Sequence, residues 1–141
     1  MKKGFTLIEL LVVIAIVATL STIVLFGITQ YINKGRDASI NGNLAVLVTA
    51  GEVYYKANGD DYRGFCESNV VINAFSQTPS ITSSNCFLEE KGIPCCNAGL
   101  NQWASCGNEF SNPEKAYCVD SRGIKKEINS AECVNSIIQC P

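Results

Sequence analysis

The chain has 141 residues, a formal net charge of −2 and 47% hydrophobic residues, and it contains no histidine. This length fits one small domain with an extension rather than two full domains. The slightly negative charge gives no general attraction for nucleic acid. Without histidine the chain lacks the usual general base, the Ser–His and Cys–His nucleophile pairs and the commonest zinc ligand, so neither enzymatic activity nor a cofactor is expected.

The chain begins with an apolar run that is long enough to span a membrane. The 24 residues from Phe5 to Ile28 contain one charged residue, Glu9. As a helix they would extend about 36 Å, and the hydrocarbon core of a bilayer is about 30 Å thick. Lys2 and Lys3 precede the run and favour an N-terminus that stays in the cytoplasm. We expect residues 5–28 to form a transmembrane or filament-core helix.

Glu9 is unusual in this run because an acidic side chain in a membrane helix costs about 2.5–3.5 kcal/mol on insertion scales. A residue of this kind is expected to have a functional partner. Cleavage after Gly4 would leave a free α-amine on Phe5, one helical turn from Glu9. In a stack of such helices, Glu9 of one copy could meet the Phe5 amine of the next. Alternatively, Glu9 lies shallow in the membrane and reaches the headgroups.

The stretch Lys2–Ile16, KKGFTLIELLVVIAI, resembles the N-terminus of type IV prepilins, and the resemblance covers about the first thirty residues. It implies that a prepilin peptidase cleaves between Gly4 and Phe5, which removes the leader 1–4, and that the new amine of Phe5 is methylated. It also implies that Glu9 guides assembly into a helical filament. Cleavage of an ordinary signal peptide near Thr19–Ser21 remains an alternative.

The resemblance also implies partners and a location. The partners would be other copies of the chain, the prepilin peptidase and the pilus assembly machinery. The precursor would lie in the inner membrane with its N-terminus in the cytoplasm, and the mature chain would form an extracellular filament. A pseudopilin of a type II secretion or DNA-uptake system shares the same motif and is the nearest alternative. A monomeric, membrane-anchored binding module is a third hypothesis, which predicts no cleavage at Gly4.

Residues 29–57 are expected to continue the helix as an amphipathic segment that packs on a C-terminal head. Apolar or small residues recur at helical spacing, at Ile40, Leu44, Leu47, Gly51 and Tyr54. The pair Asn58–Gly59 favours a helix end there. A break near Gly27 or Gly35 is the alternative. Many type IV pilins carry a helix-loosening proline about 22 residues into the mature chain, and this chain has Phe26–Gly27 there, so any loosening would depend on Gly27.

Residues 58–141 are expected to form a head held by disulfides. All eight cysteines lie there: Cys66, Cys86, Cys95, Cys96, Cys106, Cys118, Cys133 and Cys140. An even number of cysteines at this density in an exported chain indicates a disulfide framework, with 105 possible pairings. The adjacent Cys95 and Cys96 are expected to bond different partners. A zinc cluster is disfavoured because no C-x-x-C pair is present, and no metal site is expected.

The predicted fold class is α+β, with the long helix followed by a short antiparallel sheet in the head. The expected strands are Leu100–Cys106, Lys115–Val119 and Ile124–Ile128, with a turn at Asp120–Gly123. Val70–Ile72 is a further strand-like run before a polar loop over 73–85. The capping-box spacing of Asn129 and Glu132 predicts a short helix over 130–138.

Two smaller charged clusters are interpreted as solvated turns. Arg122, Lys125 and Lys126 lie at the Asp120–Gly123 turn and could contact DNA or another anionic surface, but a hairpin tip explains them as well. Asn58, Asp60 and Asp61 lack the oxygen spacing of a calcium loop. After Cys118 the chain has three scattered acidic residues, whereas the major secretion pseudopilins resemble one another in an acidic calcium loop, so the C-terminal sequence favours a pilin.

Overall fold

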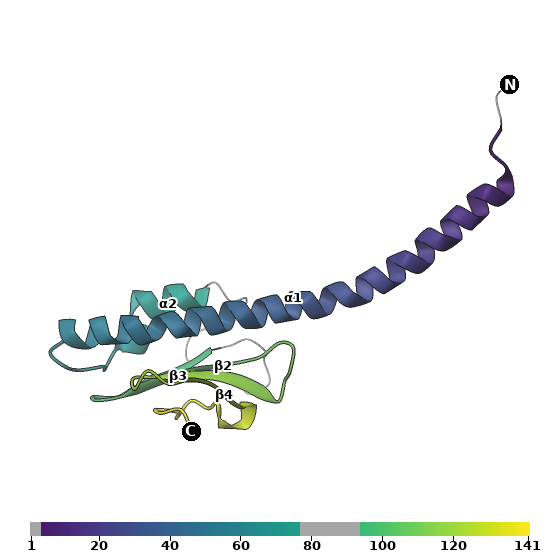
Figure 1. Cartoon of the computed structure of the whole chain (residues 1–141). Helices are drawn as coiled ribbons and strands as arrows, with labels where there is room; N and C mark the ends of the chain where they lie inside the picture. The colour runs from purple at the N-terminus through teal and green to yellow at the C-terminus, as the bar shows by residue number, and fades with distance from the viewer. Residues whose placement is uncertain (1–3, 77–93) are drawn as a thin grey trace. The chain divides into compact units, whose positions relative to one another are not determined.

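The computed structural model of the protein describes residues 4–76 and 94–141. Cys86 and most of the predicted polar loop over 73–85 lie outside these ranges. Contacts divide the chain into two units, one that ends at Asn33 and one that runs from Lys34 to Pro141. The elements in chain order (Figure 1) are α1 (Leu7–Ala57), η1 (Phe65–Glu67), α2 (Asn69–Ser76), β1 (Pro94–Ala98), β2 (Trp103–Asn108), β3 (Lys115–Asp120), β4 (Lys125–Asn129) and η2 (Ser130–Glu132).

Helix α1 confirms the predicted long helix. It continues through Gly27 and Gly35, so the alternative of two helices broken at either glycine is wrong. The helix ends where expected, because the N–H of Asn58 donates back to the carbonyl of Tyr54 and Gly59 takes a positive φ of 72°. This left-handed conformation is open to glycine at no steric cost, which makes it a common helix stop.

The second unit packs a four-stranded antiparallel sheet against the C-terminal half of α1 (Figure 1), which confirms the α+β class. The strand order is β1-β2-β3-β4, and every residue of β2 is buried. The main apolar cluster joins α1, η1, α2 and the sheet, and its buried members are Ile40, Leu44, Leu47, Tyr62, Phe65, Val71, Phe75, Trp103 and Val119. The periodic face predicted from the sequence is therefore the face that packs on the sheet.

Two local predictions were wrong, and one strand was missed. The run Val70–Ile72 lies in helix α2, because Val71 and Phe75 are four residues apart and both are buried against α1. Strand β1 was not predicted: it is short, begins with a proline and is defined by its pairing with β2. The helix predicted over 130–138 is only the three-residue η2, although the capping box of Asn129 and Glu132 is present.

The described cysteines are disulfide-bonded. Cys66 bonds Cys96, Cys106 bonds Cys133 and Cys118 bonds Cys140, with Cα–Cα distances of 5.7, 5.8 and 5.9 Å. Cys95 also forms a disulfide, so the adjacent cysteines bond different partners as predicted. The sulfurs of Cys95, Cys106 and Cys133 lie within 4.8 Å of one another, but all three are oxidised and this group offers no thiolate to a metal.

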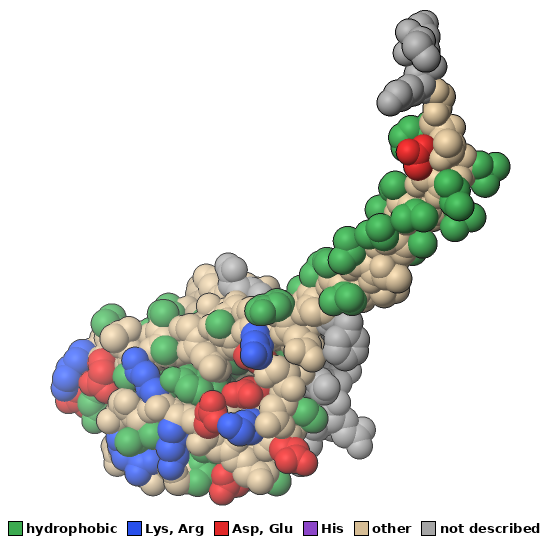
Figure 2. Space-filling view, turned by 45° about the vertical axis from the view of Figure 1, so that its right-hand side comes forward, with side chains coloured by type: hydrophobic (Ala, Val, Ile, Leu, Met, Phe, Trp, Pro, Cys, Tyr) green, Lys and Arg blue, Asp and Glu red, His purple; other side chains and the backbone are tan. Residues whose placement is uncertain are grey.

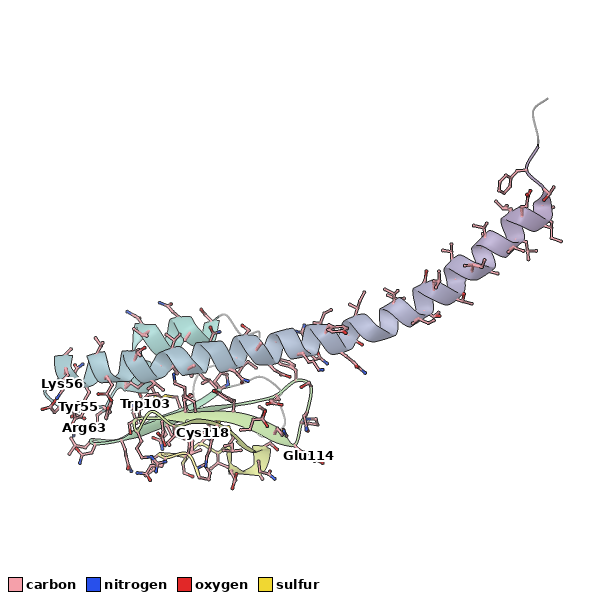
Figure 3. All side chains as sticks on the ribbon, viewed as in Figure 1. Tyr55, Lys56, Arg63, Trp103, Glu114 and Cys118 are labelled. Atoms are coloured by element: carbon pink, nitrogen blue, oxygen red, sulfur yellow. A yellow bond between two sulfur atoms is a disulfide. The ribbon has the colours of Figure 1, made fainter. Side chains whose placement is uncertain are left out.

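The sheet approaches α1 closely at Gly51. A Cβ atom added there would lie 2.6 Å from Nε1 and 2.9 Å from Cε2 of Trp103, which is fully buried (Figure 3). The indole also contacts the ring of Phe65, with 4.8 Å between centroids. Among the described residues the indole N–H has no hydrogen-bond partner, so packing alone holds the ring. The absence of a side chain at Gly51 is therefore what lets β2 and α1 meet.

We expect Gly51→Ala to destabilise the head by about 1–3 kcal/mol, because the added methyl group overlaps a rigid buried ring. Gly42→Ala is the matched control, since it lies on the same helix with nothing within 4 Å of its Cβ position. The control should stabilise by about 0.5–1 kcal/mol through helix propensity. The measurement is urea unfolding of the full chain in detergent, followed by fluorescence of Trp103, the one tryptophan. If Gly51→Ala and Gly42→Ala changed the free energy of unfolding equally and in the same direction, Trp103 would not require a glycine at position 51.

Candidate functional site

The candidate processing site lies in the residues that precede α1. Gly4, Phe5 and Thr6 come before the helix and are exposed, and the Phe5 side chain is 75% exposed. A Cβ atom on Gly4 would meet nothing within 4 Å, and Gly4 is not among the residues with a positive φ. Nothing in the described fold therefore requires glycine at position 4, so a requirement for it would come from a molecule that recognises this segment.

Glu9 and Thr6 form a capping box at the start of α1. The backbone N–H of Thr6 donates to Oε2 of Glu9 at 2.9 Å, and the Thr6 hydroxyl donates to the same oxygen at 2.7 Å. In return, the backbone N–H of Glu9 lies 3.3 Å from the Thr6 hydroxyl oxygen. This reciprocal arrangement satisfies donors at the helix start that have no partner within the helix.

The capping box offsets part of the cost of placing the Glu9 carboxylate in an apolar helix. A carboxylate at the first turn of a helix also interacts favourably with the positive end of the helix dipole. Glu9 thus has partners in the uncut chain, and it does not need the Phe5 amine to be hydrogen-bonded. Our sequence analysis missed this feature, although the signal was present as a T-x-x-E pattern in front of an apolar run.

The part of α1 in the first unit exposes its large apolar side chains, and Figure 2 shows them along one face of the helix. Three hydroxyl groups within the apolar run are satisfied by the helix itself: Thr19, Ser21 and Thr22 donate to backbone carbonyls three or four residues earlier, at 2.7–2.8 Å. Among the described residues, α1 is long and apolar enough to cross a membrane. An apolar surface with its polar atoms satisfied internally suits lipid or the interior of a helical bundle.

The remaining sequence candidates are held by neighbours within the head. Arg122 binds Asp120 and the carbonyl of Cys140, and Lys126 donates to the carbonyl of Pro141. The predicted basic cluster is therefore largely engaged with the protein itself. The predicted turn after α1 is confirmed, because Asp60 has a φ of 61° and forms an ion pair with Lys56. Asp61 pairs in the same way with Arg63.

Comparison with known proteins supports the interpretation of the N-terminus. The model of the prokaryotic N-terminal methylation motif matches residues 1–25. A segment of 49 residues, 35% of this chain, is 47% identical to the type IV major alpha-pilin of Moraxella bovis and equally to its fimbrial protein Q. The match spans 31% of each relative, and no solved structure matches the chain. The chain thus carries the prokaryotic N-terminal methylation motif, and over 49 residues it is similar to two pilins.

Proposed function

We propose that this chain is a structural subunit of a type IV pilus-like surface filament. The observation that carries the proposal is a helix whose apolar side chains are exposed and which begins at Leu7, two residues after Phe5. Burying a large apolar side chain contributes about 1.5–3 kcal/mol. Many copies that bundle residues 5–28 would bury this surface first in lipid and then in one another. The family resemblance adds the processing steps.

In this scheme the precursor sits in the inner membrane with Lys2 and Lys3 on the cytoplasmic side. A prepilin peptidase cleaves after Gly4, and the amine of Phe5 is methylated. Removal of the two leader lysines takes the side-chain charge from 11 − 13 = −2 to 9 − 13 = −4. The head stays outside the cytoplasm, which is consistent with its disulfides, since such bonds persist in oxidising compartments.

The acidic residues after Cys118 favour a pilin over a calcium-dependent pseudopilin. Asp120 accepts hydrogen bonds from Arg122 and from backbone N–H groups, Glu127 pairs with Lys115, and Glu132 closes the capping box of η2. Each of these three carboxylates is thus engaged with protein donors. The head in this proposal is structural rather than catalytic, and its negative charge gives it no general affinity for nucleic acid.

Replacement of Gly4 by leucine should block maturation while leaving the fold intact. A bulky residue would obstruct close approach of the peptidase to the backbone, whereas the chain itself has open space around a Cβ at this position. The measurement is the N-terminus and intact mass of Gly4→Leu protein from the membrane fraction, beside the same analysis of its disulfides as a control for folding. Trimming of Gly4→Leu protein to Phe5, followed by assembly, would show that the processing claim is wrong.

Substitutions at Glu9 should separate charge pairing from helix capping. Glu9→Val removes both the charge and the capping box, whereas Glu9→Gln keeps the length and the hydrogen-bond acceptor of a capping box but removes the charge. If the carboxylate pairs with the Phe5 amine of a neighbouring copy, both variants should insert in the membrane and both should lose most filaments. Without the Glu9 carboxylate, the Phe5 amine would enter the bundle unpaired, at a cost of several kcal/mol. Glu9→Asp should be intermediate, since it keeps the charge with a shorter reach.

The readout for the Glu9 series is electron microscopy of sheared filaments beside an immunoblot of the membrane fraction. Thr6→Val is the matched control, because it removes the hydroxyl partner of Glu9 but keeps the carboxylate. Glu9 would act through capping instead if Glu9→Gln formed normal filaments while Glu9→Val and Thr6→Val lost them. Loss of Glu9→Val from the membrane fraction would indicate a role in insertion.

A further inference from the structure

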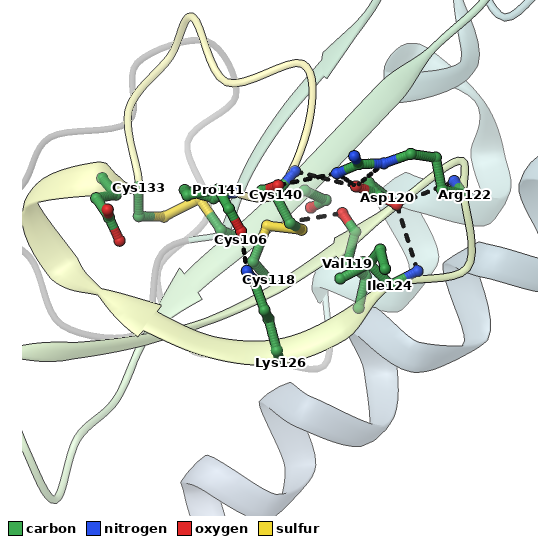
Figure 4. The surroundings of a disulfide bond; sticks show 12 residues. Cys106, Cys118, Val119, Asp120, Arg122, Ile124, Lys126, Cys133, Cys140 and Pro141 are labelled. Atoms are coloured by element: carbon green, nitrogen blue, oxygen red, sulfur yellow. Dashed lines mark hydrogen bonds and ion pairs between the residues drawn. A yellow bond between two sulfur atoms is a disulfide. The ribbon is translucent and has the colours of Figure 1, made fainter.

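A buried carboxylate holds the C-terminal segment next to a disulfide. Asp120, at the end of β3, is fully buried and lies two residues from Cys118, which bonds Cys140. Its Oδ2 accepts a hydrogen bond from the backbone N–H of Cys140 at 3.0 Å (Figure 4), across a separation of 20 residues. The Nη2 of Arg122 donates to the carbonyl of Cys140 at 2.8 Å. Both backbone polar groups of Cys140 are thus held by this Asp–Arg pair.

The rest of the Asp120 site is local to the β3–β4 hairpin. The carboxylate accepts hydrogen bonds from the backbone N–H and Nε of Arg122, both at 2.9 Å, from its Nη2 at 2.5 Å, and from the N–H of Ile124 at 3.3 Å. Gly123 takes a φ of 80° and donates to the carbonyl of Asp120 at 3.0 Å. These contacts span only a few residues, so they can form as soon as the hairpin forms.

The carboxylate is charged when it meets Cys140. Burial raises the pKa of Asp120, but hydrogen bonds from Arg122 and from the N–H of Cys140 lower that pKa by more, so it lies below its usual value. Hydrogen bonds to an ionised acceptor are stronger than those between neutral groups. The hairpin therefore presents a preorganised, charged acceptor for the one remaining donor, the N–H of Cys140.

We propose that Asp120 directs the pairing of Cys118 with Cys140 during oxidative folding, by docking the backbone of Cys140 on the hairpin before the bond forms. Eight cysteines allow 105 pairings, so a noncovalent contact that brings two cysteines together favours the native pairing over the others. The bond itself forms by thiol–disulfide exchange with a disulfide oxidant. One thiolate of the pair attacks the oxidant and releases one reduced thiol, and the second thiolate then displaces the other. Two protein thiols and one oxidant disulfide give one protein disulfide and two thiols. This inference holds whether or not the chain assembles into filaments.

The first test asks whether docking occurs without the bond. In the full chain in detergent, Cys118→Ser with Cys140→Ser should keep the backbone N–H at position 140 protected from hydrogen exchange, and adding Asp120→Asn should remove that protection. Rapid exchange at position 140 in the double variant, with β2 and β3 still protected, would overturn the proposal. Loss of protection throughout the sheet would overturn it as well, because the bond would then have to precede docking.

The second test measures the pairing itself. Reduced full-length protein is equilibrated with reduced and oxidised glutathione, and each disulfide is quantified by differential alkylation and mass spectrometry. Asp120→Asn should lower the equilibrium constant for Cys118–Cys140 at least about tenfold, the effect of losing one hydrogen bond to a charged group. The Cys66–Cys96 bond is the internal reference and should change little.

Asp61→Asn is a closely matched control for this measurement. Asp61 accepts hydrogen bonds from the N–H and Nε of Arg63 at 2.8 and 2.7 Å, which is the same local Asp-x-Arg arrangement without a distant cysteine. It should leave the Cys118–Cys140 equilibrium unchanged. If the Cys118–Cys140 equilibrium constant were the same in Asp120→Asn as in Asp61→Asn, Asp120 would not direct this pairing. The same conclusion would follow if Asp120→Asn lowered the equilibrium constants of Cys118–Cys140 and Cys66–Cys96 equally.

Discussion

An apolar helix surface that the chain leaves exposed is the constraint on which the rest of the structure depends. The large apolar side chains that the structure describes over 5–25 and 28–32 are exposed, so they require lipid or other copies of the helix around them. Two features lower the free-energy cost of burying the polar groups of this helix. The hydroxyls of Thr19, Ser21 and Thr22 bond to the helix backbone, and Glu9 is capped by Thr6. A polar group buried with its hydrogen bonds made costs far less than one buried without them.

The same helix has a second role where it joins the head. There Leu44 and Leu47 pack beside Trp103, and the missing side chain of Gly51 sets how closely helix and sheet approach. This core is small, and the disulfides hold segments that lie at its margins. Cys66–Cys96 ties η1 to an edge strand, and Cys118–Cys140 ties the C-terminal segment to β3. Constraining such loops stabilises the head mainly by restricting the unfolded chain.

The sequence predicted the elements whose signals are local. The apolar run, the periodic face through Leu44 and the Asp120–Gly123 turn are each signalled by residues close together in the chain, and the structure confirms each of them. Helix α2 carries a weak local signal, because its buried residues Val71 and Phe75 are four apart, but the β-branched run Val70–Ile72 favoured a strand. Strand β1 depends on its pairing with β2, which periodicity cannot reveal. The same holds for Asp120, because its partner Cys140 lies 20 residues away. The capping box of Glu9, by contrast, has a local signal, because Thr6 and Glu9 have the T-x-x-E spacing that predicts one.

In the proposed function this chain is cut after Gly4 and enters a surface filament. The most direct measurement is intact mass and N-terminal sequencing of the protein sheared from the cell surface. We expect a filamentous fraction whose chains begin at Phe5 and carry one extra methyl group on the terminal amine. Chains that retain Met1, or that begin after Ser21 as an ordinary secretory cleavage would leave them, would contradict it.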